Sequence, residues 1–172
     1  LVMMPGGIIN GLMAPITGKL FDKFGPRVLI IPGLALLSIA ILLFSRIDSS
    51  WTGGYVIFLH VMMMIGISMV MMPAQTTALN QLPRLLYPHG TAIMNTLQQV
   101  AGAVGMALFI SIMTAGAKNY VETTGDLNPV ESMVAGLHNA FVIGLVLAII
   151  ALVLGLFVKR TTSPVEEEQS AA

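Results

Sequence analysis

A cluster of uncharged polar side chains carries the clearest potential for binding chemistry in the sequence. Asn95, Gln98, Gln99 and Gly102 stand at positions i, i+3, i+4 and i+7, a spacing that places them on one face of a helix. Each amide both donates and accepts hydrogen bonds, so this face can bind polar groups of a ligand or of a neighbouring helix. The pattern is typical of interhelical hydrogen bonding and also of the wall of a substrate cavity, and both interpretations stay open.

A second polar pair, Gln75 and Thr76, lies near the end of the preceding apolar run. A carboxamide without a partner is costly in hydrocarbon, so we expect these side chains to face protein or water. We therefore predict that they line the same cavity as the first cluster.

Catalytic and metal-binding groupings are not expected. The three histidines are His60, His89 and His138; they are isolated from one another and no Asp or Glu interrupts the apolar runs. There is no cysteine and no glycine-rich nucleotide-binding motif. The sequence predicts no enzyme, no metal site and no cofactor.

The composition indicates a membrane protein. Apolar residues make up 56% of the 172 residues and charged residues 9%, whereas a soluble domain has about 25% charged residues. The net charge is zero and no basic face is present, so nucleic acid is not an expected partner.

Five charge-poor runs are each long enough to cross a bilayer as a helix, and they predict an all-α membrane protein. We expect helices near residues 1–17, 28–44, 54–79, 91–117 and 133–158, forming one bundle over residues 1–160. The second run is rich in Leu and Ile and nearly featureless, and we expect it to face lipid. Residues 161–172 are expected to form a disordered cytoplasmic tail.

A basic loop between the first two runs predicts the orientation. Six of the eight Lys and Arg residues lie in residues 18–27, in residues 80–90 or after residue 158. Because cytoplasmic loops are enriched in Lys and Arg, these segments are expected to be cytoplasmic in a multi-pass protein of the cell membrane. The longest loop, residues 118–132, is acidic and is expected outside.

This loop carries the pattern G-x-L-x-D-x-x-G-x-R in Gly18, Leu20, Asp22, Gly25 and Arg27. It resembles the loop between the second and third helices in each half of transporters of the major facilitator superfamily. The resemblance implies that Gly18, Asp22, Gly25 and Arg27 form a conformational motif at the inner face, in which Asp22 and Arg27 stabilise one state without contacting substrate.

The third and fourth runs are similar to a helix pair of the fourteen-span drug:proton antiporter branch of that superfamily. Where many members carry arginine, this chain has Gln98. The matching positions are Pro73, Leu82, Pro83, Gly90, Ala92, Asn95, Gln99, Gly102, Gly105 and Ala107.

The resemblance implies that the chain is the C-terminal part of an exporter, comprising the last five helices of a major facilitator fold. The implied function is proton-coupled efflux of amphipathic drugs by alternating access. The implied partners are the lipid bilayer, the N-terminal half of the same transporter, an amphipathic small molecule and protons. The proton carrier is expected in the N-terminal part. The alternatives are a uniporter, a narrow-specificity metabolite or lipid exporter, and a membrane scaffold subunit that transports nothing. Substrate identity, stoichiometry and oligomeric state do not follow from the sequence.

Overall fold

The computed structural model describes residues 4–46 and 53–158, apart from the side chains of residues 4, 5, 10 and 14. The described part contains helices and turns and no strand. The helices are α1 (Met4–Phe24), α2 (Arg27–Phe44), α3 (Gly53–Leu79), the short 3-10 turn η1 (Arg84–Leu86), α4 (Tyr87–Thr124) and α5 (Pro129–Gly155). The expected tail, residues 161–172, lies outside this part.

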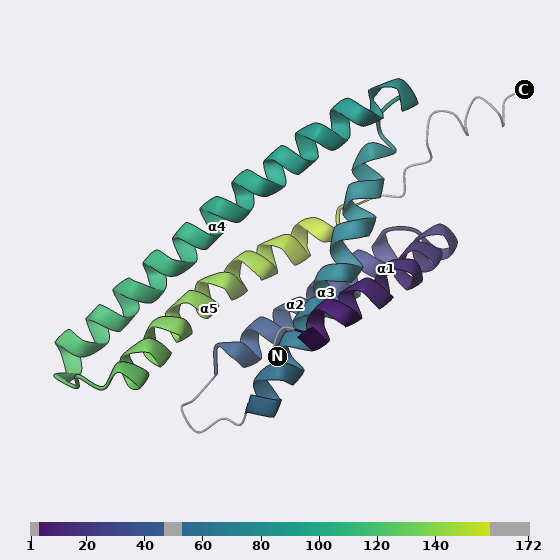
Figure 1. The fold of residues 1–172 in the computed structure, drawn as a ribbon. Coiled ribbons are helices and arrows are strands. Elements are labelled where there is room, and N and C mark those ends of the chain that lie inside the picture. The colour runs from purple at the N-terminus through teal and green to yellow at the C-terminus, as the bar shows by residue number, and fades with distance from the viewer. Residues whose placement is uncertain (1–3, 47–52, 159–172) are drawn as a thin grey trace, which may run out of the picture.

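The helices pack in an order different from their order in the sequence. α1 packs on α3, α3 on α2, α2 on α5, and α5 on α4 (Figure 1). Successive helices run in opposite directions, so the α1–α2 turn, the α3–α4 turn and the end of α5 gather at one end of the bundle. α4 therefore lies at one edge, with α5 as its main neighbour.

The fold class is confirmed as an all-α membrane protein. Four helices, α2 to α5, are long and apolar enough to cross a membrane by length and composition. α1 is 21 residues long but is not among these four helices. Its glycines and prolines, with Asn10 and Lys19, lower its mean hydropathy. The described residues thus form five α-helices where five were expected, and four of them meet this criterion.

Two helices extend further than the charge pattern predicts. α1 continues through the basic segment to Phe24, where Gly25 adopts a φ of 80° and its N–H binds the Phe21 carbonyl at 2.8 Å. This left-handed glycine satisfies a terminal carbonyl and ends the helix. The cytoplasmic loop expected over residues 18–27 is therefore a turn of two residues.

α4 likewise continues to Thr124, so the expected outer loop over residues 118–132 shrinks to residues 125–128. Lys118 and Glu122 form an i,i+4 salt bridge of 3.7 Å, which supports the extra turns. Gly125 ends α4 with a φ of 70°, and the Asn128 side chain accepts a hydrogen bond from the Val130 N–H at 3.0 Å at the start of α5. Charged residues here mark a helix outside the apolar span, not a loop.

The expectation that the second run only faces lipid is wrong, although Val28, Ile39 and Leu42 remain exposed. α2 lies between α3 and α5, and 33% of the residues in its apolar stretch are buried, against 6% for α4 with its preceding turn. A Cβ on Gly66 of α3 would lie 3.0 Å from the Gly33 carbonyl oxygen of α2, so the two backbones are in contact. Small residues allow this approach, and hydropathy alone does not distinguish a lipid face from a helix interface.

Aromatic and small residues join α2, α5 and α4. The ring of Phe141 on α5 stacks on Phe44 of α2 with centroids 5.1 Å apart, and meets the edge of Phe109 of α4 at 5.5 Å. Closer to the turn that joins them, α4 and α5 cross at Gly116 and Gly136, where a Cβ on Gly116 would lie 3.1 Å from the Gly136 Cα. A Cβ on Gly136 would overlap the Met113 carbonyl oxygen.

This crossing predicts that Gly136→Ala destabilises the full-length protein by about 1–3 kcal/mol, because the added methyl group must push two backbones apart. Gly144→Ala on the same helix is the control, since its Cβ would make only an ordinary contact, 3.8 Å from Ile41. Thermal unfolding of the detergent-solubilised protein measures both. Equal melting temperatures for the two variants would contradict the described crossing.

Candidate functional site

The turn between α3 and α4 fixes the position of the predicted polar face. Gly90, in the first turn of α4, is buried against Leu82, and a Cβ there would lie 2.5 Å from the Leu82 Cδ1 atom. The Tyr87 hydroxyl donates a weak hydrogen bond of 3.4 Å to the Asn80 side-chain oxygen across the turn. These contacts set the direction in which α4 leaves the bundle.

The polar face predicted from Asn95, Gln98, Gln99 and Gly102 lies on α4 and forms the α4 stripe. In the described part of the chain, this stripe is largely uncovered. Asn95 and Gln99 are exposed and Gln98 is half-buried. A Cβ on Gly102 or on Gly105 would meet no atom within 4 Å. Among residues 4–46 and 53–158, none donates to or accepts from these three amides. The stripe is thus available to water, a ligand or another part of a larger protein.

The second predicted pair sits differently. Gln75 and Thr76 are half-buried on α3, and the Thr76 hydroxyl donates to the Met72 carbonyl of its own helix at 3.0 Å. Next to them, the buried Thr77 hydroxyl donates to the Pro73 carbonyl at 2.7 Å. No hydrogen bond joins Gln75 or Thr76 to the α4 stripe within the described residues, and α3 and α4 diverge from their shared turn (Figure 1). The structure therefore presents two separate polar groups.

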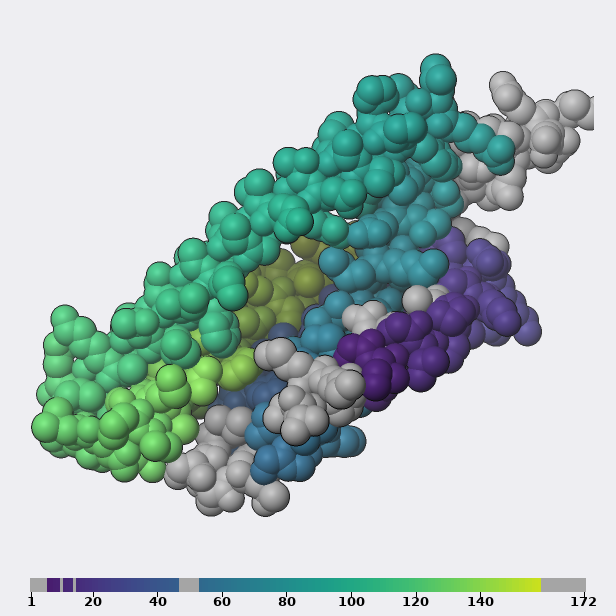
Figure 2. Space-filling model, in the orientation of Figure 1, coloured from purple at the N-terminus to yellow at the C-terminus, as the bar shows by residue number. Residues whose placement is uncertain are grey.

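Figure 2 shows the consequence for the surface. α4 runs along one edge of the molecule, and a trough separates it from α3, with α5 visible at its base. The trough follows from the packing order, since α5 packs along α4 whereas α3 contacts α4 only slightly.

The four residues of the conformational loop motif differ in the contacts that they make. Gly18 lies within α1 next to α3, where a Cβ would be 3.5 Å from the Met72 Cε atom. Gly25 forms the left-handed turn, and the Arg27 guanidinium donates to the Leu156 carbonyl at 2.6 Å. Asp22 is exposed, and the structure shows no capping bond or ion pair for it within the described residues. Arg27 thus fastens the start of α2 to the end of α5.

Two further contacts were not anticipated from the sequence. His60 on α3 packs over the bare backbone of Gly6, where a Cβ would lie 2.8 Å from the imidazole ring. The His138 Nδ1 atom on α5 lies 2.5 Å from the Ser45 carbonyl oxygen at the end of α2. Glycines in α1 signal close helix approach, but nothing in the sequence identifies the partner.

Comparison with known proteins gives the family. The model of the Major Facilitator Superfamily matches residues 1–106, which is more than half of the chain. The chain belongs to the Major Facilitator Superfamily. The match includes the basic loop motif and the α4 stripe, so the resemblance stated from those residues is confirmed at the level of the superfamily.

Individual relatives extend this Major Facilitator Superfamily assignment. The chain is 55% identical over 163 residues to the lincomycin resistance protein LmrB of Listeria monocytogenes, covering 93% of the chain and 35% of the relative. It is 51% identical over 166 residues to LmrB of Bacillus subtilis, covering 93% and 34%, and 27% identical over 165 residues to the puromycin resistance protein pur8 of Streptomyces alboniger, covering 91% and 32%. The chain thus spans about a third of the length of these relatives. No solved structure matches it significantly.

The contact of Arg27 predicts a measurable role. Arg27→Ala in the full-length transporter should lower the free energy of unfolding by about 1 kcal/mol, because the Leu156 carbonyl loses its charged donor at an exposed site. Lys19→Ala is the control, since Lys19 is exposed and makes no ion pair within the described residues. Chemical unfolding of the purified protein compares the two, and an equal loss in both would contradict a specific tether.

Proposed function

We propose that the chain is part of an exporter of amphipathic drugs that exchanges its substrate for protons. The observation that carries the proposal is the 51–55% identity to relatives named lincomycin resistance proteins over 93% of the chain. The names of pur8 and of the multidrug efflux pump LfrA of Mycolicibacterium smegmatis, 22% identical over 129 residues, support the same class.

The α4 stripe supports a transport role in preference to a scaffold role. A subunit that only assembles with other helices would use Gln98 and Gln99 for contacts, whereas Gln99 is exposed and neither amide forms a hydrogen bond with another described residue. Carboxamides facing an aqueous cavity keep their hydrogen bonds with water until a substrate replaces them. In this proposal Asn95, Gln98 and Gln99 contact substrate, with Gln75 and Thr76 on a second wall.

Charge supports the orientation. The end of the bundle that holds the α1–α2 and α3–α4 turns carries Lys19, Lys23, Arg27 and Arg84. The opposite end carries three acidic residues, Glu122, Asp126 and Glu131, around the α4–α5 turn, with two basic residues, Lys118 and Arg46. We place the basic end, with the C-terminus, in the cytoplasm. The four-residue loop motif then lies at the inner face, where movement against the N-terminal half changes access to the cavity.

The first test measures transport directly. The full-length transporter in inverted membrane vesicles is expected to take up lincomycin when the interior is acidified, and an uncoupler should abolish the uptake because it removes the proton gradient. Vesicles without the transporter are the control. Uptake of lincomycin alone among several amphipathic drugs would favour the narrow-specificity exporter, and no uptake by folded protein would contradict the proposal.

A second test addresses the stripe. Gln99→Leu is expected to lower the rate of lincomycin uptake about three- to tenfold at unchanged expression, because one substrate hydrogen bond of about 1 kcal/mol is lost. Val104→Leu, on the opposite face of α4 and also exposed, is the matched control and should transport normally. Normal uptake by Gln99→Leu for every exported compound would refute a cavity role for this residue.

A further inference from the structure

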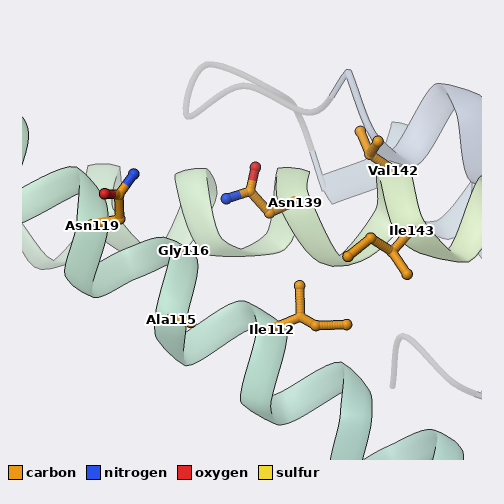
Figure 3. Close-up of a pocket in the computed structure, with 7 residues that line it drawn as sticks. All are labelled: Ile112, Ala115, Gly116, Asn119, Asn139, Val142 and Ile143. Atoms are coloured by element: carbon orange, nitrogen blue, oxygen red, sulfur yellow. The ribbon is translucent and has the colours of Figure 1, made fainter.

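An open-sided cavity of about 400 Å³ lies between α4 and α5, where Ala115, Asn119 and Asn139 of its lining are exposed. It lies away from the polar stripe and outside residues 1–106 that the family model matches. Figure 3 shows its lining. The side chains that define its chemistry are Ile112, Asn119, Asn139, Val142 and Ile143, and Gly116 contributes bare backbone. The volume falls within the range of about 300–1,000 Å³ that is typical of sites for drug-sized ligands.

The cavity lies beside the helix crossing. Gly116 and Gly136 bring the two backbones into contact there, and Gly116 is part of the lining. The Asn139 amide lies over Gly116, where a Cβ would be 2.6 Å from the Nδ2 atom. A larger residue at position 116 would therefore displace the amide from the cavity.

The lining is polar at one end and apolar at the other. Asn119 and Asn139 lie on one side of the cavity, and the isoleucines and Val142 lie on the other (Figure 3). Asn119 follows Lys118, the first charged residue after the apolar run of α4, and Asn139 lies in α5 next to His138. The amides therefore mark the outer edge of the apolar span, and Ile112 and Ile143 lie deeper within it.

The lining also limits the chemistry of an occupant. It contains no charged side chain, and neither amide forms a hydrogen bond with another described residue. Both amides are exposed, so an occupant that supplies hydroxyl, amide or ester groups can replace water on their donors and acceptors. An apolar body would replace lipid or water against Ile112, Val142 and Ile143.

We propose that this cavity is a second binding site for the exported compound, in which an amphipathic molecule places neutral hydrogen-bonding groups on Asn119 and Asn139 and its apolar body against the isoleucines. The site lies at the outer edge of the membrane span, where a compound leaving the transporter passes from protein to the outer surface. The proposal rests on the proposed export function and adds a location that the α4 stripe does not provide.

The test uses thiol labelling, which the chain favours because it contains no cysteine. Ala115, which also lines the cavity, and its exposed neighbour Thr114, which does not, are each changed to cysteine in a cysteine-free full-length transporter. Lincomycin is the probe and a small maleimide is the label. At ten times its half-protecting concentration, lincomycin should slow labelling of Ala115→Cys about tenfold and leave Thr114→Cys unchanged.

The amides give an independent readout. Asn139→Ala or Asn119→Ala, each in the Ala115→Cys background, should raise the half-protecting concentration about three- to tenfold, as expected for one lost hydrogen bond. Lincomycin uptake is measured in the same preparations. Protection that is equally strong without either amide would overturn the assigned ligand contacts.

Two outcomes overturn the site itself. Labelling of Ala115→Cys at the same rate with and without lincomycin, in vesicles that transport it, would refute this inference and leave the export function intact. A cysteine at position 115 that no label reaches would show that another part of the transporter fills the cavity. Protection without transport would instead refute the export function alone and retain the binding site.

Discussion

Direct contact between helix backbones is the constraint on which this structure depends. In a bilayer, lipid tails are as apolar as leucine, so helices gain little from hiding apolar side chains and associate through close packing. The chain meets this requirement at Gly33 and Gly66, and again at Gly116 and Gly136. The first pair places α2 beside α3, and the second joins α4 to α5.

The same contacts determine what remains open. Because α5 lies between α2 and α4 and α3 contacts α4 only slightly, the face of α4 that carries the amides has no hydrogen-bonding partner in the described chain and stays largely uncovered. The cavity that Asn119 and Asn139 line lies beside the crossing of α4 and α5 at Gly116 and Gly136. Close packing and open polar surface are thus two results of one arrangement of small residues.

The charge pattern was misleading about secondary structure. Lys19, Asp22 and Lys23 suggested a loop, yet they lie in the last turns of α1. Lys118 and Glu122 suggested another loop, yet they form an ion pair within α4. Charged residues with good helix propensity extend a helix beyond the apolar span, and only Gly25 and Gly125, with their positive φ angles, end the two helices.

The sequence by itself determined the class, the approximate positions of the helices and the family, because apolar runs of membrane length and the spacing of Gly18 to Arg27 are local properties of the chain. It also identified the α4 stripe, since helical periodicity alone puts Asn95, Gln98 and Gln99 on one face. Only the tertiary structure decided that α2 packs between α3 and α5, that Arg27 binds the end of α5, and that Asn119 and Asn139 share a cavity. These features join residues distant in the sequence, and their geometry depends on which glycines meet, which no local pattern specifies.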